Sequence, residues 1–324
     1  MPMRMTPCCD MKALRAELSR RARRRATPGT ARALAGPGHG PFAGVSTPRL
    51  IQTLRVAQRA IYGTDNRRDI FQVTTPEIRA VADGIAALVE APKLRKTAGG
   101  RYRLATSSYR DDYELCDAEP FVNQPVGCFC TGFLVAPDVV ATAGHCVRSS
   151  IAARRTRFVF GFRMLDHNRP RTTFPARDVY QGVALLAREE DDAGADWALV
   201  RLDRPVVGRG SLRVRSAGKI GDGQPLFVIG HPNGLPAKFA GGARVRHNRR
   251  LAFFVANLDT YGGNSGSPVF DQRTKVVEGI LASGEDDFVR NGDCFLSLVC
   301  PDAGCRGEAV TRSTLWADRI PGRP

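Results

Sequence analysis

Several features that would place a chain in a special class are missing from this sequence of 324 residues. No run of about 18 apolar residues occurs, which excludes a membrane-spanning helix on length alone. There is no Cys-x-x-Cys pair, the usual half of a structural zinc site, so we expect no bound metal. Residues 1–25 also lack the stretch of about 7–15 apolar residues that follows the basic start of a secretory signal.

Acidic residues are too few to balance the basic ones. Lys and Arg number 48 against 32 Asp and Glu, and residues 1–35 hold nine basic residues against Asp10 and Glu17. A second basic cluster comprises Arg244, Arg246, Arg249 and Arg250. Such charge would suit a nucleic-acid binder, but only 7% of the residues are aromatic, and they are not interleaved with basic ones as single-strand binding requires. We therefore expect a solvated basic surface and no nucleic-acid partner.

Composition divides the chain into three parts. Residues 1–48 form a basic, Gly/Pro-rich tail that we expect to be disordered. Residues 49–117 show apolar residues at helical spacing, which predicts a small helical lead-in or a pro-segment that is partly removed by proteolysis. These apolar residues are Leu50, Leu54, Ala57 and Ile61, followed by Ile78, Val81, Ala82, Ile85, Leu88 and Val89. Residues 118–320 instead contain short β-branched and aromatic runs between turn residues, which predicts an all-β domain.

Three short motifs within the β region carry the residue types of nucleophilic catalysis. They are ATAGHC ending at Cys146, ADWALVRL from Ala195 and GGNSGSP around Ser265. A serine hydroxyl is a weak nucleophile at neutral pH and needs an adjacent base, which His145 can provide while Asp196 holds its other ring nitrogen. Each motif alone is typical of an ordinary turn. Three in this order predict a catalytic triad of His145, Asp196 and Ser265.

These motifs resemble those of the chymotrypsin-like serine peptidases, over roughly residues 118–320. The bacterial branch with the glutamyl endopeptidases is most similar, because the nucleophile lies in GNSGSPVF. The resemblance implies two six-stranded antiparallel β-barrels, with His145 and Asp196 from the first barrel and Ser265 from the second. It also implies an oxyanion hole made by the N–H groups of Gly263 and Ser265, and a reaction that needs no cofactor.

The cysteines favour an oxidising compartment, and we expect a secreted or periplasmic protein. The chain has nine cysteines, of which seven lie between Cys116 and Cys305. The resemblance implies a disulfide between Cys130 and Cys146, directly after the catalytic histidine. One further bridge is expected among Cys294, Cys300 and Cys305, whereas pairing of Cys116 with Cys128 is left open.

The resemblance also indicates where substrate would bind. Backbone groups of residues in the stretch after the nucleophile should pair with an extended substrate, Gly284 leaving the pocket mouth open. This stretch contains Leu281, Ala282, Ser283 and Gly284. Glutamyl endopeptidases have Gly-Ile-His here, whereas this chain has Gly-Ile-Leu, so a strict preference for Glu is not expected. Asp259 stands where trypsin-like enzymes have the pocket aspartate, which would favour Arg or Lys before the scissile bond. Alternatively, Asp259 caps a turn or pairs with a nearby arginine.

We therefore expect a monomeric serine endopeptidase that acts on proteins or peptides. The alternative is a catalytically silent homologue that acts as a binding protein. The silent homologue is less favoured, because no residue of the triad or the oxyanion loop has been replaced.

Overall fold

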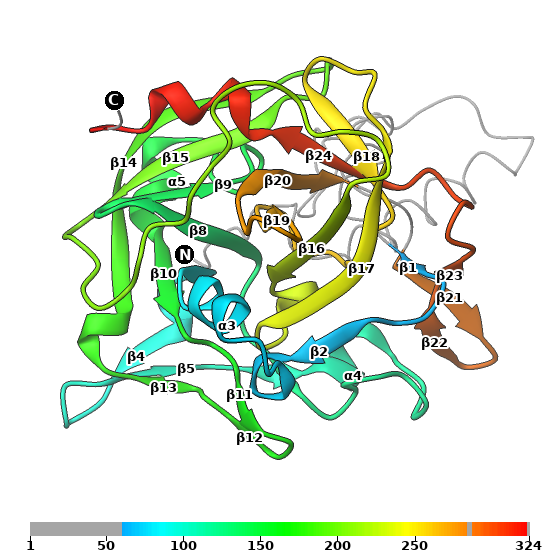
Figure 1. Ribbon diagram of the computed structural model, residues 1–324. Coiled ribbons are helices and arrows are strands. Elements are labelled where there is room, and N and C mark those ends of the chain that lie inside the picture. The colour runs from blue at the N-terminus through cyan, green and yellow to red at the C-terminus, as the bar shows by residue number, and fades with distance from the viewer. Residues whose placement is uncertain (1–59, 284–286, 323–324) are drawn as a thin grey trace, which may run out of the picture.

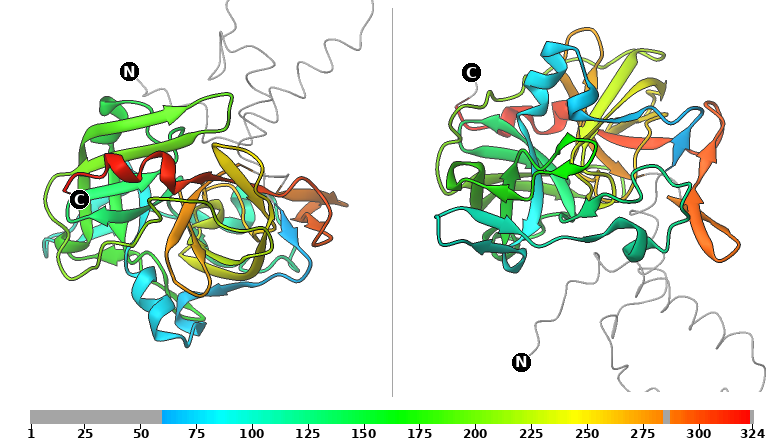
Figure 2. Two further views of the ribbon diagram at one scale, coloured as in Figure 1. Left: turned by 45° about the horizontal axis from the view of Figure 1, so that its top comes forward. Right: turned by 90° about the horizontal axis from the view of Figure 1, so that it is seen from below.

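Two six-stranded antiparallel barrels make up most of the computed structural model, which describes residues 60–283 and 287–322 (Figure 1). The barrels lie side by side, and the predicted all-β, chymotrypsin-like fold is confirmed. In Figure 2 the first barrel is mostly green and cyan, and the second is yellow and orange. Each barrel closes on itself, so none of its six strands leaves a free edge.

The first barrel is built from apolar strands that pack against one another around a closed ring. In ring order they are β3 (Ile85–Glu90), β8 (Cys130–Ala136), β9 (Val139–Thr142), β15 (Asp196–Leu202), β14 (Val179–Glu190) and β10 (Thr156–Phe160). Every residue of β8 and β9 is buried, as expected for strands covered on both faces. Gly132 in β8 allows close packing, because a Cβ there would lie 2.7 Å from Cγ1 of Val140.

The second barrel closes through a pairing between its first two strands. In ring order it contains β16 (Pro225–Gly230), β19 (Pro268–Asp271), β20 (Val277–Ser283), β24 (Glu308–Arg312), β18 (Phe253–Ala256) and β17 (Lys238–His247). The short strand β2 (Arg67–Asp69) adds to the outside of this barrel by pairing with β17. A segment from the N-terminal side of the first barrel is thus held on the second.

One apolar core joins the two barrels. It contains Phe133 from the first barrel and Phe227 and Ile280 from the second, all fully buried. After β24 the chain returns across the first barrel, and the ring of Trp316 lies 6.0 Å from that of Phe133. The barrels therefore share core residues, so that groups presented by each can hold fixed positions relative to one another.

The predicted boundary at residue 118 is wrong, because the first barrel begins earlier in the chain. The helical pattern forms a helix only in α3 (Pro76–Ala82), and Ile85–Glu90 is the barrel strand β3. A continuous apolar run of this length fits a buried strand as well as a buried helix. Residues 85–90 adopt the strand conformation because they pair with β8 and β10. Removal of residues 49–117 as a pro-segment would therefore remove a barrel strand.

The other predictions for the N-terminal region fall mostly on residues that the structure does not describe. The tail 1–48 and the first helical pattern, except Ile61, lie outside the described residues. Ile61 belongs to β1 (Ile61–Tyr62), which pairs in parallel with β23 (Val299–Cys300).

The remaining elements are short and lie around the barrels. The helices are α4 (Tyr109–Tyr113) and α5 (Ser150–Arg155). The strands are β4 (Leu94–Lys96), β5 (Tyr102–Leu104), β6 (Ser107–Ser108), β7 (Pro125–Val126), β11 (Met164–Asp166), β12 (Arg169–Pro170), β13 (Thr173–Phe174), β21 (Phe288–Asn291) and β22 (Cys294–Ser297). The 3-10 turns are η1 (Ile70–Gln72), η2 (Ala91–Lys93), η3 (Ala176–Asp178), η4 (Pro232–Gly234), η5 (Ser313–Leu315) and η6 (Ala317–Arg319).

Three disulfides link the described part of the chain. Two agree with expectation: Cys130–Cys146, and the bridge Cys300–Cys305 within the C-terminal group. The third joins Cys116 to Cys294 over a sequence separation of 178, so the alternative pairing of Cys116 with Cys128 is wrong. Cys128 is the free cysteine among the described residues. In the same part of the chain, no helix is both long and apolar enough to cross a membrane.

Candidate active site

The pairing of β9 with β15 brings His145 and Asp196 together. Ala198 lies opposite Thr142 in this pair of strands, so the residues just before Ala198 lie beside those just after Thr142. Gly144 makes the approach possible, since a Cβ at this position would lie 3.0 Å from the carbonyl oxygen of Trp197. Both polar side chains thus come from the first barrel.

The Asp196 carboxylate holds His145 at two points. Oδ2 lies 2.6 Å from Nδ1 of the ring, and Oδ1 accepts a hydrogen bond from the backbone N–H of His145 at 3.0 Å. Burial alone would raise the pKa of Asp196, but the His145 ring and the backbone donors lower it below its ordinary value. The ionised carboxylate therefore favours a proton on Nδ1, which leaves Nε2 free to act as a base.

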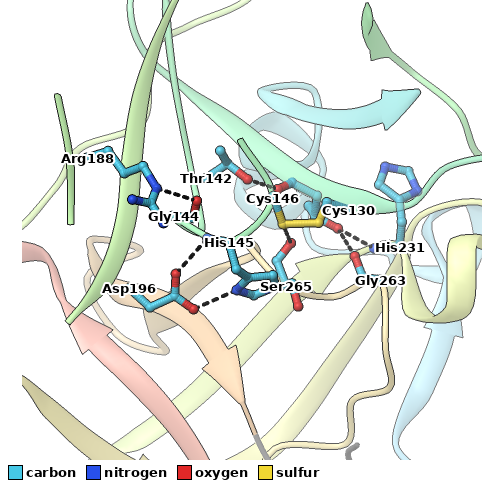
Figure 3. Close-up of a disulfide and its surroundings, with 11 residues drawn as sticks. Cys130, Thr142, Gly144, His145, Cys146, Arg188, Asp196, His231, Gly263 and Ser265 are labelled. Carbon is cyan, nitrogen blue, oxygen red and sulfur yellow. Dashed lines mark hydrogen bonds and ion pairs between the residues drawn. A yellow bond between two sulfur atoms is a disulfide. The ribbon is translucent and has the colours of Figure 1, made fainter. Parts of the chain in front are cut away.

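Ser265 reaches this pair from the second barrel, on the loop between β18 and β19. Its side chain lies beside the His145 ring, which stands between it and Asp196 (Figure 3). The carbonyl oxygen of Ser265 accepts a hydrogen bond from the Thr131 N–H at 2.9 Å and lies 3.7 Å from Sγ of Cys146. The Cys130–Cys146 disulfide therefore lies next to the backbone of the candidate nucleophile.

The loop that precedes Ser265 has the backbone conformation of a tight turn. Gly263 has a φ of 77°, and Gly266 has a φ of 89°, both in the left-handed region that favours glycine. A Cβ on Gly263 would lie 2.6 Å from the carbonyl oxygen of His231, so the loop packs directly against the turn after β16. Substitution of Gly263 would thus disturb both the conformation and the packing of the proposed oxyanion hole.

Thr131 in β8 is a residue that the sequence analysis did not single out. Its Oγ1 donates to the carbonyl of Gly263 at 2.9 Å and accepts from the His231 N–H at 3.0 Å. Together with its N–H bond to Ser265, these contacts tie the first barrel to both ends of the loop. The signal was available, because a polar residue inside an otherwise apolar strand must find hydrogen-bond partners.

His231, to which no function was assigned from the sequence, is part of the same support. It is buried, its Nδ1 lies 2.9 Å from the carbonyl oxygen of Leu235, and its ring stacks on Phe162. Burial lowers the pKa of His231 to about 4, so the ring is neutral at pH 7 and donates through Nδ1–H. We assign it a structural role in shaping the turn.

The predicted substrate-binding strand runs beside the loop of Ser265. Leu281 is joined to the loop by two hydrogen bonds, from its N–H to Ser267 and from the Gly266 N–H to its carbonyl, both 2.9 Å. Ala282 and Ser283 continue β20 to its end. Gly284 lies outside the described residues.

Asp259 has the environment of a residue that caps a turn. Its side chain is buried, Oδ1 accepts the Tyr62 N–H at 2.7 Å, and Oδ2 accepts the Asn66 N–H at 2.9 Å. Burial raises the pKa of Asp259 to about 6. Both oxygens thus hold the N-terminal segment on the second barrel, which matches the alternative interpretation made from the sequence.

The candidate site contains one group of side chains of the metal-ligating type. The side chains of Cys130, His145 and Cys146 place possible ligand atoms within 4.8 Å of one another. The two sulfurs are bonded to each other in a disulfide, however, and are not available as thiolate ligands.

The chain is similar in sequence to known proteins. Residues 130–280 match the family described as "Trypsin-like peptidase domain". A glutamyl endopeptidase from Bacillus licheniformis is 26% identical over 152 residues, covering 44% of this chain and 45% of the relative. The secreted RxLR effector protein 73 from Plasmopara viticola is 29% identical over 214 residues, covering 60% of this chain and 47% of the relative.

The chain spans about half the length of the two curated relatives. A solved structure of a Glu endopeptidase in complex with MPD is 18% identical with a TM-score of 0.45, covering 80% of this chain and 97% of that chain. The resemblance to chymotrypsin-like serine peptidases of the bacterial type, predicted from the motifs, is confirmed by the family match and the curated relative.

Proposed function

We propose that this chain, with a trypsin-like peptidase domain over residues 130–280, is a serine endopeptidase that uses His145, Asp196 and Ser265. The observation that carries the proposal is the position of the His145 ring, bound to Asp196 at 2.6 Å and adjacent to Ser265 across the two barrels. The family match and the likeness to a glutamyl endopeptidase support the same reaction class.

In the proposed mechanism each group has one task. His145 removes the proton from Ser265 Oγ as that oxygen attacks the scissile carbonyl, and Asp196 stabilises the imidazolium. The N–H groups of Gly263 and Ser265 stabilise the negative charge on the carbonyl oxygen. His145 then donates its proton to the leaving amine, and water releases the acyl group from Ser265 by the same steps.

A direct test compares hydrolysis of fluorescent casein by the oxidised protein and by its Ser265→Ala variant. We expect activity in the first and a loss of at least 10³-fold in the second, because the nucleophile is missing. Ser313→Ala is a matched control, since this buried serine binds the Arg215 carbonyl outside the site. An inactive wild type that is correctly folded and processed would contradict the proposal and favour the silent homologue.

The finer proposal concerns preference for Arg or Lys before the scissile bond. Three buried carboxylates surround the segment before Ser265: Asp259, Asp287, which accepts the Gly262 N–H, and Glu308, which accepts the Thr260 hydroxyl at 3.0 Å. Clustered buried carboxylates favour a cationic substrate side chain.

A mixed peptide library tests this preference. We expect cleavage mainly after Arg and Lys, with a larger loss of that preference in Glu308→Gln than in Asp259→Asn, because Asp259 already binds two backbone N–H groups. Asp271→Asn is a control, since Asp271 is buried in the same barrel but caps the turn after β19. A dominant preference for Glu or for large apolar residues would contradict the proposal.

The protein that acts in this way is proposed to be secreted or periplasmic and to work on protein or peptide substrates as a monomer. Its disulfides support an oxidising compartment, and one curated relative carries the word secreted in its name. If the N-terminal region is processed, the retention of β1, β2 and β3 in the fold implies cleavage before Ala60. N-terminal sequencing of the exported protein tests this.

A further inference from the structure

The turn between β16 and β17 lies under the loop that carries Gly263. It consists of His231, η4 and Leu235, and it is held internally by bonds from the Gly234 N–H to His231 and from the Leu235 N–H to Pro232. The Gly127 N–H also donates to the carbonyl of Gly234 at 2.9 Å. Every residue of this turn is buried. The turn is therefore a rigid surface against which another loop can be positioned.

One hydrogen bond connects this turn to the loop of the proposed oxyanion hole. The Asn233 N–H donates to the carbonyl oxygen of Gly262. The described residues contain no cis peptide bond, so the carbonyl of Gly262 and the N–H of Gly263 point in opposite directions from the peptide they share. With the carbonyl bound to Asn233, the Gly263 N–H must point away from the turn.

Asn233 has a backbone conformation that few residues adopt. Its φ is 50° and its ψ is 24°, in the left-handed region where asparagine is tolerated better than most side chains. Two tyrosines hold it there. Its side-chain Nδ2 donates to Tyr109 Oη at 3.2 Å, and its carbonyl oxygen accepts from Tyr113 Oη at 3.4 Å. Burial raises the pKa of both tyrosines, so their hydroxyls remain protonated.

The two tyrosines belong to α4, in a segment that is part of neither barrel. This segment is fixed at several points: the Tyr109 N–H bonds to the Gln124 carbonyl at 3.3 Å, the Tyr109 ring packs on Tyr113, and the Cys116–Cys294 disulfide ties it to β22. The proposed mechanism does not use this segment. Its contacts with Asn233 indicate that it supports the turn beside Gly262 and Gly263.

We propose that Asn233 is a positioning residue of the oxyanion hole, which holds the Gly262–Gly263 peptide with its N–H directed at the substrate carbonyl. The segment that contains α4 supports Asn233 through Tyr109 and Tyr113. This inference rests on the proposed peptidase function, because the N–H direction matters only where a carbonyl oxygen becomes negative. Asn233 does not contact substrate and acts through Gly263.

Steady-state kinetics of three variants test the assignment. Asn233→Ala strains the backbone and removes the bond to Tyr109, and we expect kcat to fall at least tenfold while KM stays within about threefold, the signature of a weakened transition-state contact. Asn233→Gly tolerates the positive φ and retains the N–H, so it should lose less. Tyr109→Phe removes the partner of Nδ2 and should resemble Asn233→Gly.

Tyr180→Phe is the matched control. Tyr180 is as buried as Tyr109, and its hydroxyl likewise makes one bond, to the Arg177 carbonyl at 2.7 Å, but it lies in the first barrel away from the loop. We expect unchanged kcat in this variant despite a similar loss of stability. If Asn233→Ala and Tyr109→Phe lower kcat no more than Tyr180→Phe does, or change only KM, the proposal is wrong.

Crystal structures of the wild type and Asn233→Ala separate this inference from the proposed function. We expect the Gly263 N–H to change direction in the variant. An unchanged Gly262–Gly263 peptide unit would overturn the inference even in an active enzyme. If the wild type hydrolyses no substrate but the Gly262–Gly263 unit does change direction in Asn233→Ala, the proposed function fails and the positioning role of Asn233 stands.

Discussion

At the scale of single residues, the geometry of the candidate site depends on individual hydrogen bonds between its side chains and the backbone. The carboxylate of Asp196 accepts both a ring N–H and a backbone N–H from His145, so one side chain sets the position and the tautomer of this histidine. Substitutions that conserve shape but change hydrogen-bonding character therefore give the most information.

Asp196→Asn is the first such substitution. The amide cannot act as an ionised acceptor for Nδ1–H and favours the wrong histidine tautomer, so we expect kcat to fall by about 10⁴-fold with little change in fold. Hydrolysis of a peptide amide and a circular dichroism spectrum measure the two effects. Full activity in a folded Asp196→Asn variant would rule out the role proposed for Asp196.

Thr131→Val is the second. Valine has the same shape but cannot bond to Gly263 or to the His231 N–H, and leaving such buried groups unpaired should lower the free energy of unfolding by about 2 kcal/mol and reduce kcat. Thr156→Val is the control, because that buried hydroxyl bonds only within the α5 region, to Ala152. Urea unfolding and steady-state kinetics of both variants distinguish the roles. Equal effects of Thr131→Val and Thr156→Val on kcat would contradict a specific role of Thr131 in supporting the loop.

At the scale of elements, the site lies where strand ends from two barrels meet. β9 and β15 present His145 and Asp196, and the loop after β18 presents Ser265. The Cys130–Cys146 disulfide connects β8 to the residue next to His145, so a covalent bond fixes the position of His145 relative to the strand that carries Thr131.

Removal of this disulfide tests its contribution. In the loop-entropy account, a Cys130→Ala and Cys146→Ala double variant, with a sequence separation of 16, should lose about 3 kcal/mol of unfolding free energy, and its activity should fall. The Cys300–Cys305 bridge has a separation of only 5, and its removal should cost about 2 kcal/mol without a comparable loss of kcat. Denaturant unfolding gives the free energies. A similar loss of kcat in both double variants would contradict a specific role beside His145.

At the scale of the whole molecule, buried titratable groups make stability depend on pH. The folded-state pKa of His231 is about 4, below its ordinary value of 6.5, so the unfolded chain binds a proton first as the pH falls. Its contribution to stability is therefore present above pH 6.5 and is lost between pH 6.5 and 4. Asp259 has the opposite sign: with a raised pKa of about 6, the folded state binds the proton first, and stability rises as the pH falls from 6 to 3.8.

The variant His231→Asn distinguishes the contribution of His231 to the pH dependence of stability from that of Asp259. Asparagine can still donate to Leu235 but does not titrate, so the variant should be less stable than the wild type at pH 7, and the difference should shrink by about 2 kcal/mol at pH 4.5. Urea unfolding of both proteins at the two pH values measures this. A difference in unfolding free energy that does not change with pH would show that His231 is not buried in its neutral form.

The sequence by itself determined the candidate chemistry and the fold class. Histidine, aspartate and serine each lie in a short motif with glycines or strand residues around them, and these motifs are local, so they can be identified without knowledge of the fold. The resemblance of these motifs to the chymotrypsin-like serine peptidases implied the Cys130–Cys146 bridge, which the structure contains. The cadence of short apolar runs was sufficient to predict an all-β domain.

Only the tertiary structure decided which groups support that chemistry. The run Ile85–Glu90 is apolar at nearly every position and becomes a strand because β8 and β10 pair with it. Asp259 binds amides from a segment almost 200 residues earlier, and Cys116 pairs with Cys294 over 178 residues. Such contacts leave no periodic or local signal in the sequence. They exist because barrel closure brings distant segments together and because buried polar groups must then be paired.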